Sequence, residues 1–128
     1  MSDPLRITKV VSHPLRAKLP TVQHTSQGEW PALEIVIVEI TTDSGLVGIG
    51  ECLARRGAAG YARFIDAALA PKLIGRSAHD RGALWVAMRN TLTGRTGGMM
   101  IEAIAGIDTA LWDLAGQAAV QPIWRLLG

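Results

Sequence analysis

The stretch from Ala103 to Gly128, AIAGIDTALWDLAGQAAVQPIWRLLG, decides the fold of this chain. It reads as a long helix that is apolar on nearly every side, followed by a last short amphipathic helix with Pro122 at its first position. A helix that is apolar all round must be buried on most of its surface. We therefore expect a long helix over residues 100–120 inside the core, and a further domain that joins the chain at Gly128.

The composition is that of one globular domain. The chain has 128 residues, of which 48% are hydrophobic and 19% charged, and its mean hydropathy is +0.23. No apolar run reaches the ~18 residues that span a bilayer, because Gly106, Asp108 and Asp113 interrupt the best candidate. The N-terminus has no basic segment leading into an apolar one. We expect a cytoplasmic protein that does not enter membranes.

Charge and cysteine content exclude two classes of protein. The net charge is +2, and the arginines are scattered singly apart from Arg55 and Arg56. A nucleic-acid-binding surface needs a basic stripe with aromatic residues, and the sequence shows none. Cys52 is alone, which excludes an internal disulfide and a cysteine metal cluster.

The first fifty residues predict strands and the rest predicts helices, an order typical of an α+β fold. Strands are expected at Leu5–Ser12, Leu33–Thr42 and Leu46–Cys52, with a tight turn at 43–45, as a three-stranded antiparallel meander. The middle strand is apolar on both faces, so both faces should be covered. The helices of this chain can cover one of them, and the other needs protein outside this sequence.

Helical spacing then predicts a bundle. The first helix is expected over Ala58–Ala70, the next starts near a capping box at Ser77 and Asp80, and a glycine-rich break at 94–98 precedes the long helix. Residues between Leu15 and Leu33 show no period, which predicts a long loop. Such a loop in a small domain is more often functional than idle.

Motifs for complete catalytic sites are missing. Asp108 and Asp113 are five residues apart on a helix, so their side chains point about 140° apart and are interpreted as structural acids. The glycines of GLVGIGE, at 45–51, lie in a predicted hairpin and shape close packing rather than a dinucleotide site. No histidine spacing suits zinc. In the long loop, His24 is the candidate for a ligand-facing role, and Arg55 with Arg56 are either a carboxylate clamp or a solvated pair.

Three segments carry a family resemblance: TTDSGLVGIGE (41–51), APKLIGR (70–76) and above all Ala103–Gly128. They resemble the N-terminal capping domain of the enolase superfamily, in its mandelate racemase and muconate-lactonizing branch. The resemblance covers essentially residues 1–128. It implies an α+β cap, a meander followed by a helical bundle, with a TIM-like barrel expected after residue 128 and absent from this chain.

In this family the barrel carries a Lys-x-Lys pair, three carboxylates that hold Mg²⁺, and the other acid and base residues. The lysines here are Lys9, Lys18 and Lys72, so no Lys-x-Lys is present. The resemblance therefore implies that catalytic residues and metal ligands are not in this chain. Whether the chain alone is an enzyme stays open, whereas its full-length parent would be a Mg²⁺-dependent lyase or isomerase.

Two family loops map onto this sequence, at about Leu19–Pro31 and Leu53–Gly60. In the family both reach over the barrel mouth and shape specificity, which by position makes six residues substrate-binding: Val22, Gln23, His24, Trp30, Arg55 and Arg56. The implied partners are the chain's own barrel, a small carboxylate substrate and further copies of the chain in a homo-oligomer.

The implied parent chemistry abstracts the proton α to a carboxylate and stabilises the enediolate with Mg²⁺. The polar loop residues favour an acid-sugar dehydratase or a mandelate racemase-like enzyme. A muconate cycloisomerase-like enzyme is an alternative. A non-catalytic, free-standing cap that serves in assembly is another.

Overall fold

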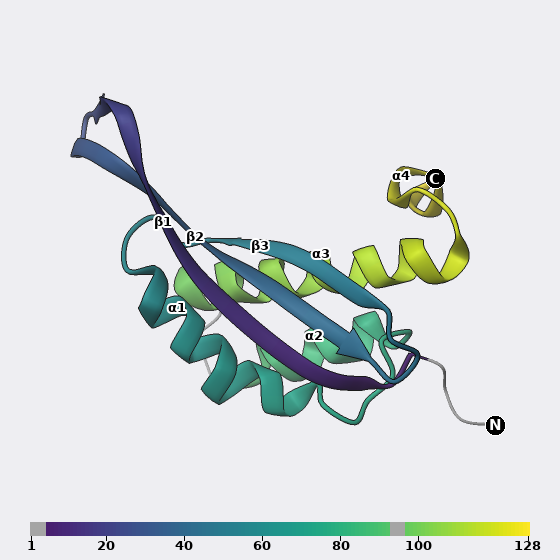
Figure 1. The fold of residues 1–128 in the computed structure, drawn as a ribbon. Helices are drawn as coiled ribbons and strands as arrows, with labels where there is room; N and C mark the ends of the chain where they lie inside the picture. Colours follow the sequence, from purple (N-terminus) through teal and green to yellow (C-terminus); the bar gives the residue numbers. More distant parts are fainter. Residues whose placement is uncertain (1–4, 93–96) are drawn as a thin grey trace.

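The computed structural model describes residues 5–92 and 97–128. Its three strands form one antiparallel sheet in the order β1-β2-β3 (Figure 1). The strands are β1 (Ile7–Thr25), β2 (Gly28–Thr42) and β3 (Val47–Leu53). The predicted meander is confirmed.

The helices follow the strands along the chain, as the α+β prediction requires. They are α1 (Ala58–Phe64), a π-helical segment η1 (Ile65–Leu69), a 3₁₀ turn η2 (Ala70–Lys72), α2 (Arg81–Arg89), α3 (Met99–Ala119) and α4 (Ile123–Leu127). The helices α1 and α3 pack against one face of the sheet, α2 packs against α3 on the same side, and α4 turns away at the end of α3 (Figure 1).

The long loop predicted between the first two strands is wrong. Both β1 and β2 continue as a two-stranded ribbon until they meet at the Thr25–Gly28 pair, and the ribbon extends beyond the rest of the domain (Figure 1). Water reaches both faces of such a ribbon, and backbone hydrogen bonds hold it, so its side chains need no alternation of polar and apolar types. The period-2 signal is therefore missing although the strands are present.

The ribbon carries one irregularity. Between the pairs Lys18–Ala32 and Gln23–Trp30, β1 has four residues, 19–22, where β2 has only Pro31. A proline has no N–H to donate to the ladder, so pairing is interrupted at that point. We call residues 19–31, which include this bulge and the turn, the outer ribbon.

The core lies between the sheet and α3. The largest fully buried side chains include Val36 and Ile40 from β2 and Ile107, Leu111 and Leu114 from α3. These are the apolar faces that the sequence pattern predicted for the middle strand and the long helix.

The glycines of β3 allow the sheet and α3 to approach closely. A Cβ added at Gly50 would lie 2.0 Å from the Gly106 carbonyl oxygen, and one added at Gly48 would lie 2.3 Å from the Ala110 carbonyl oxygen. In the opposite direction, a Cβ at Gly106 would lie 2.7 Å from Cys52 Cβ. The predicted role of these glycines in close packing is confirmed, and we call this contact the glycine seam.

The two aspartates of α3 are structural, as predicted. Asp113 Oδ2 accepts a hydrogen bond of 2.8 Å from the Ile49 backbone N–H, and so ties β3 to α3 next to the glycine seam. Burial raises the pKa of the Asp108 carboxyl, and the nearby Arg81 guanidinium and a hydrogen bond from Trp112 oppose that shift.

The capping box predicted at Ser77 and Asp80 is wrong. The helix α2 begins at Arg81 with Asp80 as its N-cap residue, and the N-cap side chain makes no capping hydrogen bond. Ser77 Oγ instead accepts a hydrogen bond from the His79 N–H, and the backbone N–H of Ala78 donates to the Leu5 carbonyl. Pairing with the start of the chain therefore holds this segment outside the helix.

Two further predictions concern the ends of the long helix. Pro122 is the N-cap of α4 rather than its first residue, and the glycine-rich break predicted at 94–98 lies largely outside the described residues.

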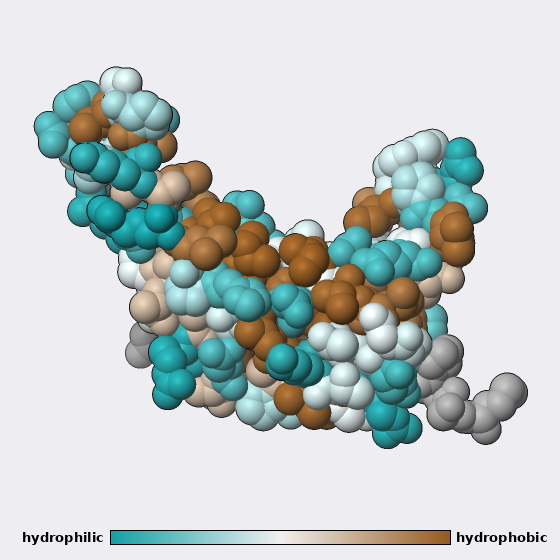
Figure 2. All heavy atoms as spheres, viewed as in Figure 1, coloured by the Kyte–Doolittle hydropathy of each residue, from teal (hydrophilic) through white to brown (hydrophobic). Residues whose placement is uncertain are grey.

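The second face of the sheet is open in this chain. Four large apolar side chains on it are between 42% and 50% exposed: Leu15, Leu33, Ile49 and Leu53. Apolar residues gather on the concave surface between the ribbon and α4 (Figure 2). Trp124 in α4 is 67% exposed. The prediction that this chain covers only one face of the middle strand is confirmed. No helix among the described residues is long and apolar enough to cross a membrane.

Candidate functional site

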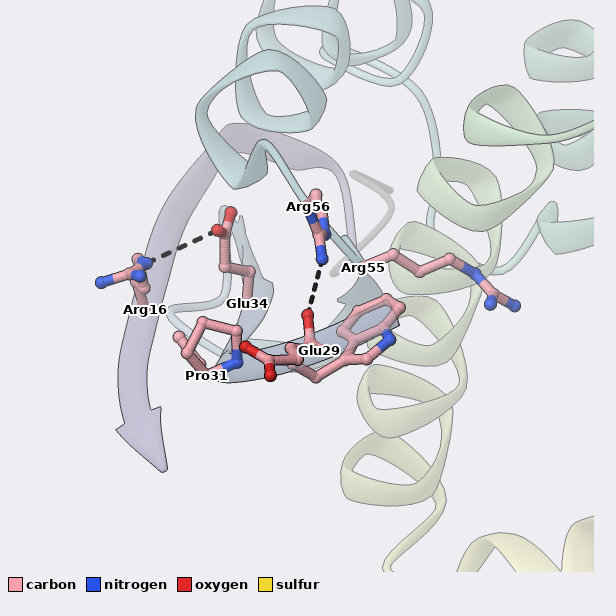
Figure 3. A pocket seen from close by; sticks show the side chains of 8 residues that line it. Arg16, Glu29, Pro31, Glu34, Arg55 and Arg56 are labelled. Atoms are coloured by element: carbon pink, nitrogen blue, oxygen red, sulfur yellow. Dashed lines mark hydrogen bonds and ion pairs between the residues drawn. The ribbon is translucent and has the colours of Figure 1, made fainter. Parts of the chain in front are cut away.

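A hollow of about 310 Å³ lies where the outer ribbon meets the segment between β3 and α1 (Figure 3). It brings together residues that are far apart in the sequence: Arg16, Glu29, Trp30, Pro31, Ala32, Glu34, Arg55 and Arg56. Three of the six predicted site residues, Trp30, Arg55 and Arg56, are in this lining. The hollow therefore joins the two segments that the family resemblance singled out.

Arg56 reaches from the β3–α1 segment to the ribbon. Its Nη2 donates a hydrogen bond of 2.8 Å to the Glu29 carbonyl oxygen (Figure 3). Its guanidinium carbon also lies 5.3 Å from the centre of the Trp30 ring, within the range of a cation–π contact.

Arg55 points the other way. Its Nε lies 3.3 Å from Glu102 Oε1 on α3, and the side chain turns away from the other lining residues (Figure 3). The two adjacent arginines therefore have different partners within the domain, and both side chains remain exposed to solvent.

The ribbon orients Trp30 from its own side as well. The indole N–H donates a hydrogen bond of 3.3 Å to Thr25 Oγ1 across the turn. His24 lies next to this turn, with Nδ1 at 3.7 Å from Glu29 Oε1 and its side chain 70% exposed. Gln23 is paired with Trp30 in the ladder, and Val22 belongs to the bulge. These three residues lie on the outer ribbon beside the hollow and are not in its lining.

Glu34 fixes the start of α1. Its Oε2 accepts hydrogen bonds from the backbone N–H groups of Gly57, at 2.7 Å, and Ala58, at 2.9 Å. Its other oxygen lies 3.6 Å from Arg16 Nε. The two backbone hydrogen bonds, from Ala58 and Gly57 in that order, lower the pKa of the Glu34 carboxyl, and Arg16 contributes to the same shift. A carboxylate at a helix N-terminus also suits the helix dipole.

A second carboxylate holds the same segment from the opposite side. Glu102 Oε2 accepts a hydrogen bond of 2.6 Å from the Tyr61 hydroxyl, and Oε1 faces Arg55. Arg55 has a positive φ of 37° and Gly57 one of 81°, so the backbone on both sides of Arg56 is sharply bent. Sequence reasoning missed Glu34 and Glu102. A charged residue within an apolar strand is the signal that would have pointed to Glu34, whereas nothing in the local sequence pairs Glu102 with Tyr61.

We expect the Tyr61 hydroxyl to titrate far above the usual range. The hydrogen bond to Glu102, followed by burial and the Glu102 charge, raises the pKa of Tyr61 to about 12. The chain has one tyrosine, so ultraviolet absorbance of the tyrosinate follows this group alone. Because the pKa of Tyr61 is higher in the folded state than in the unfolded state, its hydrogen bond to Glu102 contributes fully to folding stability below about pH 10, the ordinary tyrosine pKa. This contribution is lost as the pH rises toward 12.

The matched variant is Glu102→Gln, which removes the charge and keeps the side-chain size. Its titration midpoint is expected to fall back toward 10, as it does for the wild-type chain in denaturant. A midpoint near 10 in the folded wild-type chain would contradict the Tyr61–Glu102 contact.

The described residues hold no group of three or more His, Cys, Asp or Glu side chains that is able to bind a metal ion. The two carboxylates of the hollow have other partners: Glu34 binds backbone amides and faces Arg16, and Glu29 faces His24. The residues described here therefore do not fit a Mg²⁺ site, and we derive no step through a metal in this domain.

Residues 6–128 match the family described as the N-terminal domain of mandelate racemase and muconate lactonizing enzyme. The chain belongs to this family. The cap is therefore an N-terminal domain of the enolase superfamily, and the resemblance inferred from the sequence is confirmed.

Solved structures agree with this assignment. An enolase-superfamily member from a Polaromonas species matches 96% of the cap with a TM-score of 0.89 and 34% identity, and the cap covers 33% of that chain. A racemase from Streptomyces coelicolor, solved with bound magnesium, matches 95% of the cap with a TM-score of 0.89 and 32% identity, and the cap covers 35% of it.

Curated relatives include acid-sugar dehydratases. A D-mannonate dehydratase from Rhizorhabdus wittichii is 37% identical over 98 residues, which are 77% of the cap and 24% of the relative. A D-galactonate dehydratase from Klebsiella pneumoniae is 41% identical over 96 residues, which are 73% of the cap and 24% of the relative. The cap thus spans about a quarter of the length of these relatives. Within residues 5–92 and 97–128 the structure contains no TIM-like barrel.

Proposed function

We propose that this chain is the specificity cap of a Mg²⁺-dependent enzyme that abstracts the proton α to a carboxylate, and that the enzyme is an acid-sugar dehydratase. The observation that carries the proposal is the hollow where Trp30 and Arg56 meet, because it joins two distant segments into one surface. Two dehydratases of sugar acids among the relatives support the substrate class. The magnesium-bound racemase supports a racemase of 2-hydroxy acids as the second candidate.

In this proposal the six candidate residues form or position the part of the substrate pocket that the cap supplies. Val22, Gln23, His24 and Trp30 belong to the outer ribbon, and Arg55 and Arg56 lie at its base. Histidine and glutamine side chains offer hydrogen bonds to hydroxyl and carboxylate oxygens. The Trp30 ring provides an apolar wall that excludes water, which strengthens polar interactions in a closed site.

The remaining parts of the proposed enzyme lie outside the described residues. A catalytic barrel follows residue 128, supplies the acid and base residues and binds Mg²⁺, while the cap closes the site over the substrate. The open apolar face of the sheet and the exposed α4 support burial against further protein, either this barrel or another copy in a homo-oligomer. We place the enzyme in the cytoplasm.

The test compares two proteins on one substrate panel. The protein is purified as its gene encodes it and is incubated with Mg²⁺ and a panel of sugar acids, 2-hydroxy acids and muconates, while residues 1–128 alone receive the same treatment. We expect the gene product to dehydrate at least one sugar acid. The isolated cap should turn over none, because it does not contain the proposed acid, base and metal-binding residues.

Each of the other outcomes favours a different function. Exchange of the α-proton without dehydration favours the racemase, and conversion of a muconate favours the cycloisomerase. Turnover by residues 1–128 alone would contradict the division of labour between cap and barrel. A gene that ends at codon 128, with no activity in its product, would favour a free-standing cap that serves in assembly.

A further inference from the structure

The outer ribbon, residues 19–31, has little to hold it in place. It is built of two strands only, and nearly all of its residues are exposed. Among the hydrogen bonds of the described residues, the one from Arg56 to the Glu29 carbonyl is the one that reaches the outer ribbon from another part of the fold. The Arg56–Trp30 contact adds a second point of attachment to the same side chain.

The backbone on both sides of Arg56 is held in place by contacts with the rest of the fold. On its C-terminal side, Glu34 from β2 binds the backbone N–H groups of Gly57 and Ala58. On its N-terminal side, Glu102 from α3 faces the Arg55 guanidinium. The backbone that carries Arg56 is therefore held to the sheet by one carboxylate and to α3 by another.

We propose that Arg56 is a positioning residue, which holds the outer ribbon in the orientation that presents Trp30 and His24 to the substrate. Its guanidinium is already engaged by a carbonyl oxygen and an aromatic face, so it acts through the ribbon rather than by clamping a substrate carboxylate. The part of this inference that concerns substrate rests on the proposed function. The part that concerns the ribbon rests on the contacts alone.

The first test measures ribbon opening without any substrate. Hydrogen–deuterium exchange, analysed peptide by peptide by mass spectrometry, is applied to the protein as its gene encodes it. In Arg56→Ala we expect the amides of residues 19–31 to exchange about tenfold faster, since a charge-assisted hydrogen bond and a cation–π contact are lost together. Arg56→Lys keeps the charge but not the planar fork, so it should restore part of the protection.

Arg89→Ala is the matched control. Arg89 lies 5.4 Å from the Trp85 ring in α2 and makes a similar arginine–tryptophan contact away from the ribbon. Its loss should leave exchange of residues 19–31 unchanged. Equal exchange of this peptide in wild type and Arg56→Ala would overturn the proposal.

The second test uses the substrate identified by the panel. Arg56→Ala is expected to raise KM about tenfold and to change kcat less than about threefold, because the ribbon binds substrate and does not perform the chemistry. Trp30→Ala combined with Arg56→Ala should cost little more than the worse single variant, because both act through one ribbon orientation. A fall in kcat/KM without faster exchange would show direct contact with substrate instead, and would overturn the positioning role.

The two proposals fail separately. Faster exchange in Arg56→Ala together with no turnover of any panel compound would sustain the ribbon attachment and contradict the proposed function. Turnover of a sugar acid together with unchanged exchange would support the proposed function and contradict the attachment of the ribbon by Arg56.

Discussion

Gly50→Ala is expected to lower the free energy of unfolding by about 3 kcal/mol or more, the upper range for overpacking a core. The added Cβ would lie 2.0 Å from the Gly106 carbonyl oxygen and 2.7 Å from the Ala110 nitrogen. Both are backbone atoms of α3, so no side-chain rotation relieves the clash. To make room, the helix must move away from β3, and this movement weakens the whole sheet–helix contact.

The comparison that isolates this effect is Gly82→Ala in α2, where an added Cβ meets nothing within 4 Å. The same chemical change there should leave stability unchanged or raise it by up to about 1 kcal/mol. Chemical denaturation followed by circular dichroism measures both variants. If Gly50→Ala unfolds at the same denaturant concentration as the wild type, the glycine seam is not as close as described. Gly106→Ala gives a second measurement from the helix side, because its Cβ would lie 2.7 Å from Cys52 Cβ.

Leu111→Ala is expected to cost about 2–5 kcal/mol, the usual price of a large cavity in a core. Leu111 is fully buried, with 0% of its surface exposed, and α3 joins the sheet to α2 and α4. A domain of this size has a total stability of about 5–15 kcal/mol, so the variant loses a large part of it.

Leu127→Ala is the matched control, because Leu127 in α4 is 64% exposed in this chain. The same truncation there should change the free energy of unfolding of residues 1–128 by less than about 0.5 kcal/mol. Thermal unfolding of the two variants provides the comparison. Equal losses at Leu111 and Leu127 would contradict a core centred on α3.

The parts of the fold that depend on burial could be predicted from the sequence. The long helix is apolar on most sides because α3 is buried against the sheet, and the small residues at Gly48, Gly50 and Gly106 mark a close contact. Asp108 and Asp113 could be set aside as catalytic partners from helix geometry alone. In each case the type of side chain reflects what the residue packs against.

The parts of the fold that depend on backbone pairing or on distant contacts could not be predicted from the sequence. The outer ribbon is held by its ladder, so residues 19–31 carry no alternating pattern and resemble a loop. The Ser77 capping box failed because the backbone there pairs with Leu5 and Arg6, just before β1, which local sequence does not show. The hollow was found only in part, since Glu34 and Glu102 support Arg56 through contacts across 23 and 47 residues of sequence.

The ladder that holds the outer ribbon also affects how this protein can evolve. Most side chains of residues 19–31 are exposed on both faces and fill no core, so replacing them costs little stability. The glycine seam, where a Cβ added at Gly48 or Gly50 would overlap backbone atoms of α3, tolerates almost no replacement. Mutational tolerance thus coincides on the outer ribbon with the proposed substrate contacts, and under that proposal new substrate preferences arise by point mutation while the rest of the fold stays intact.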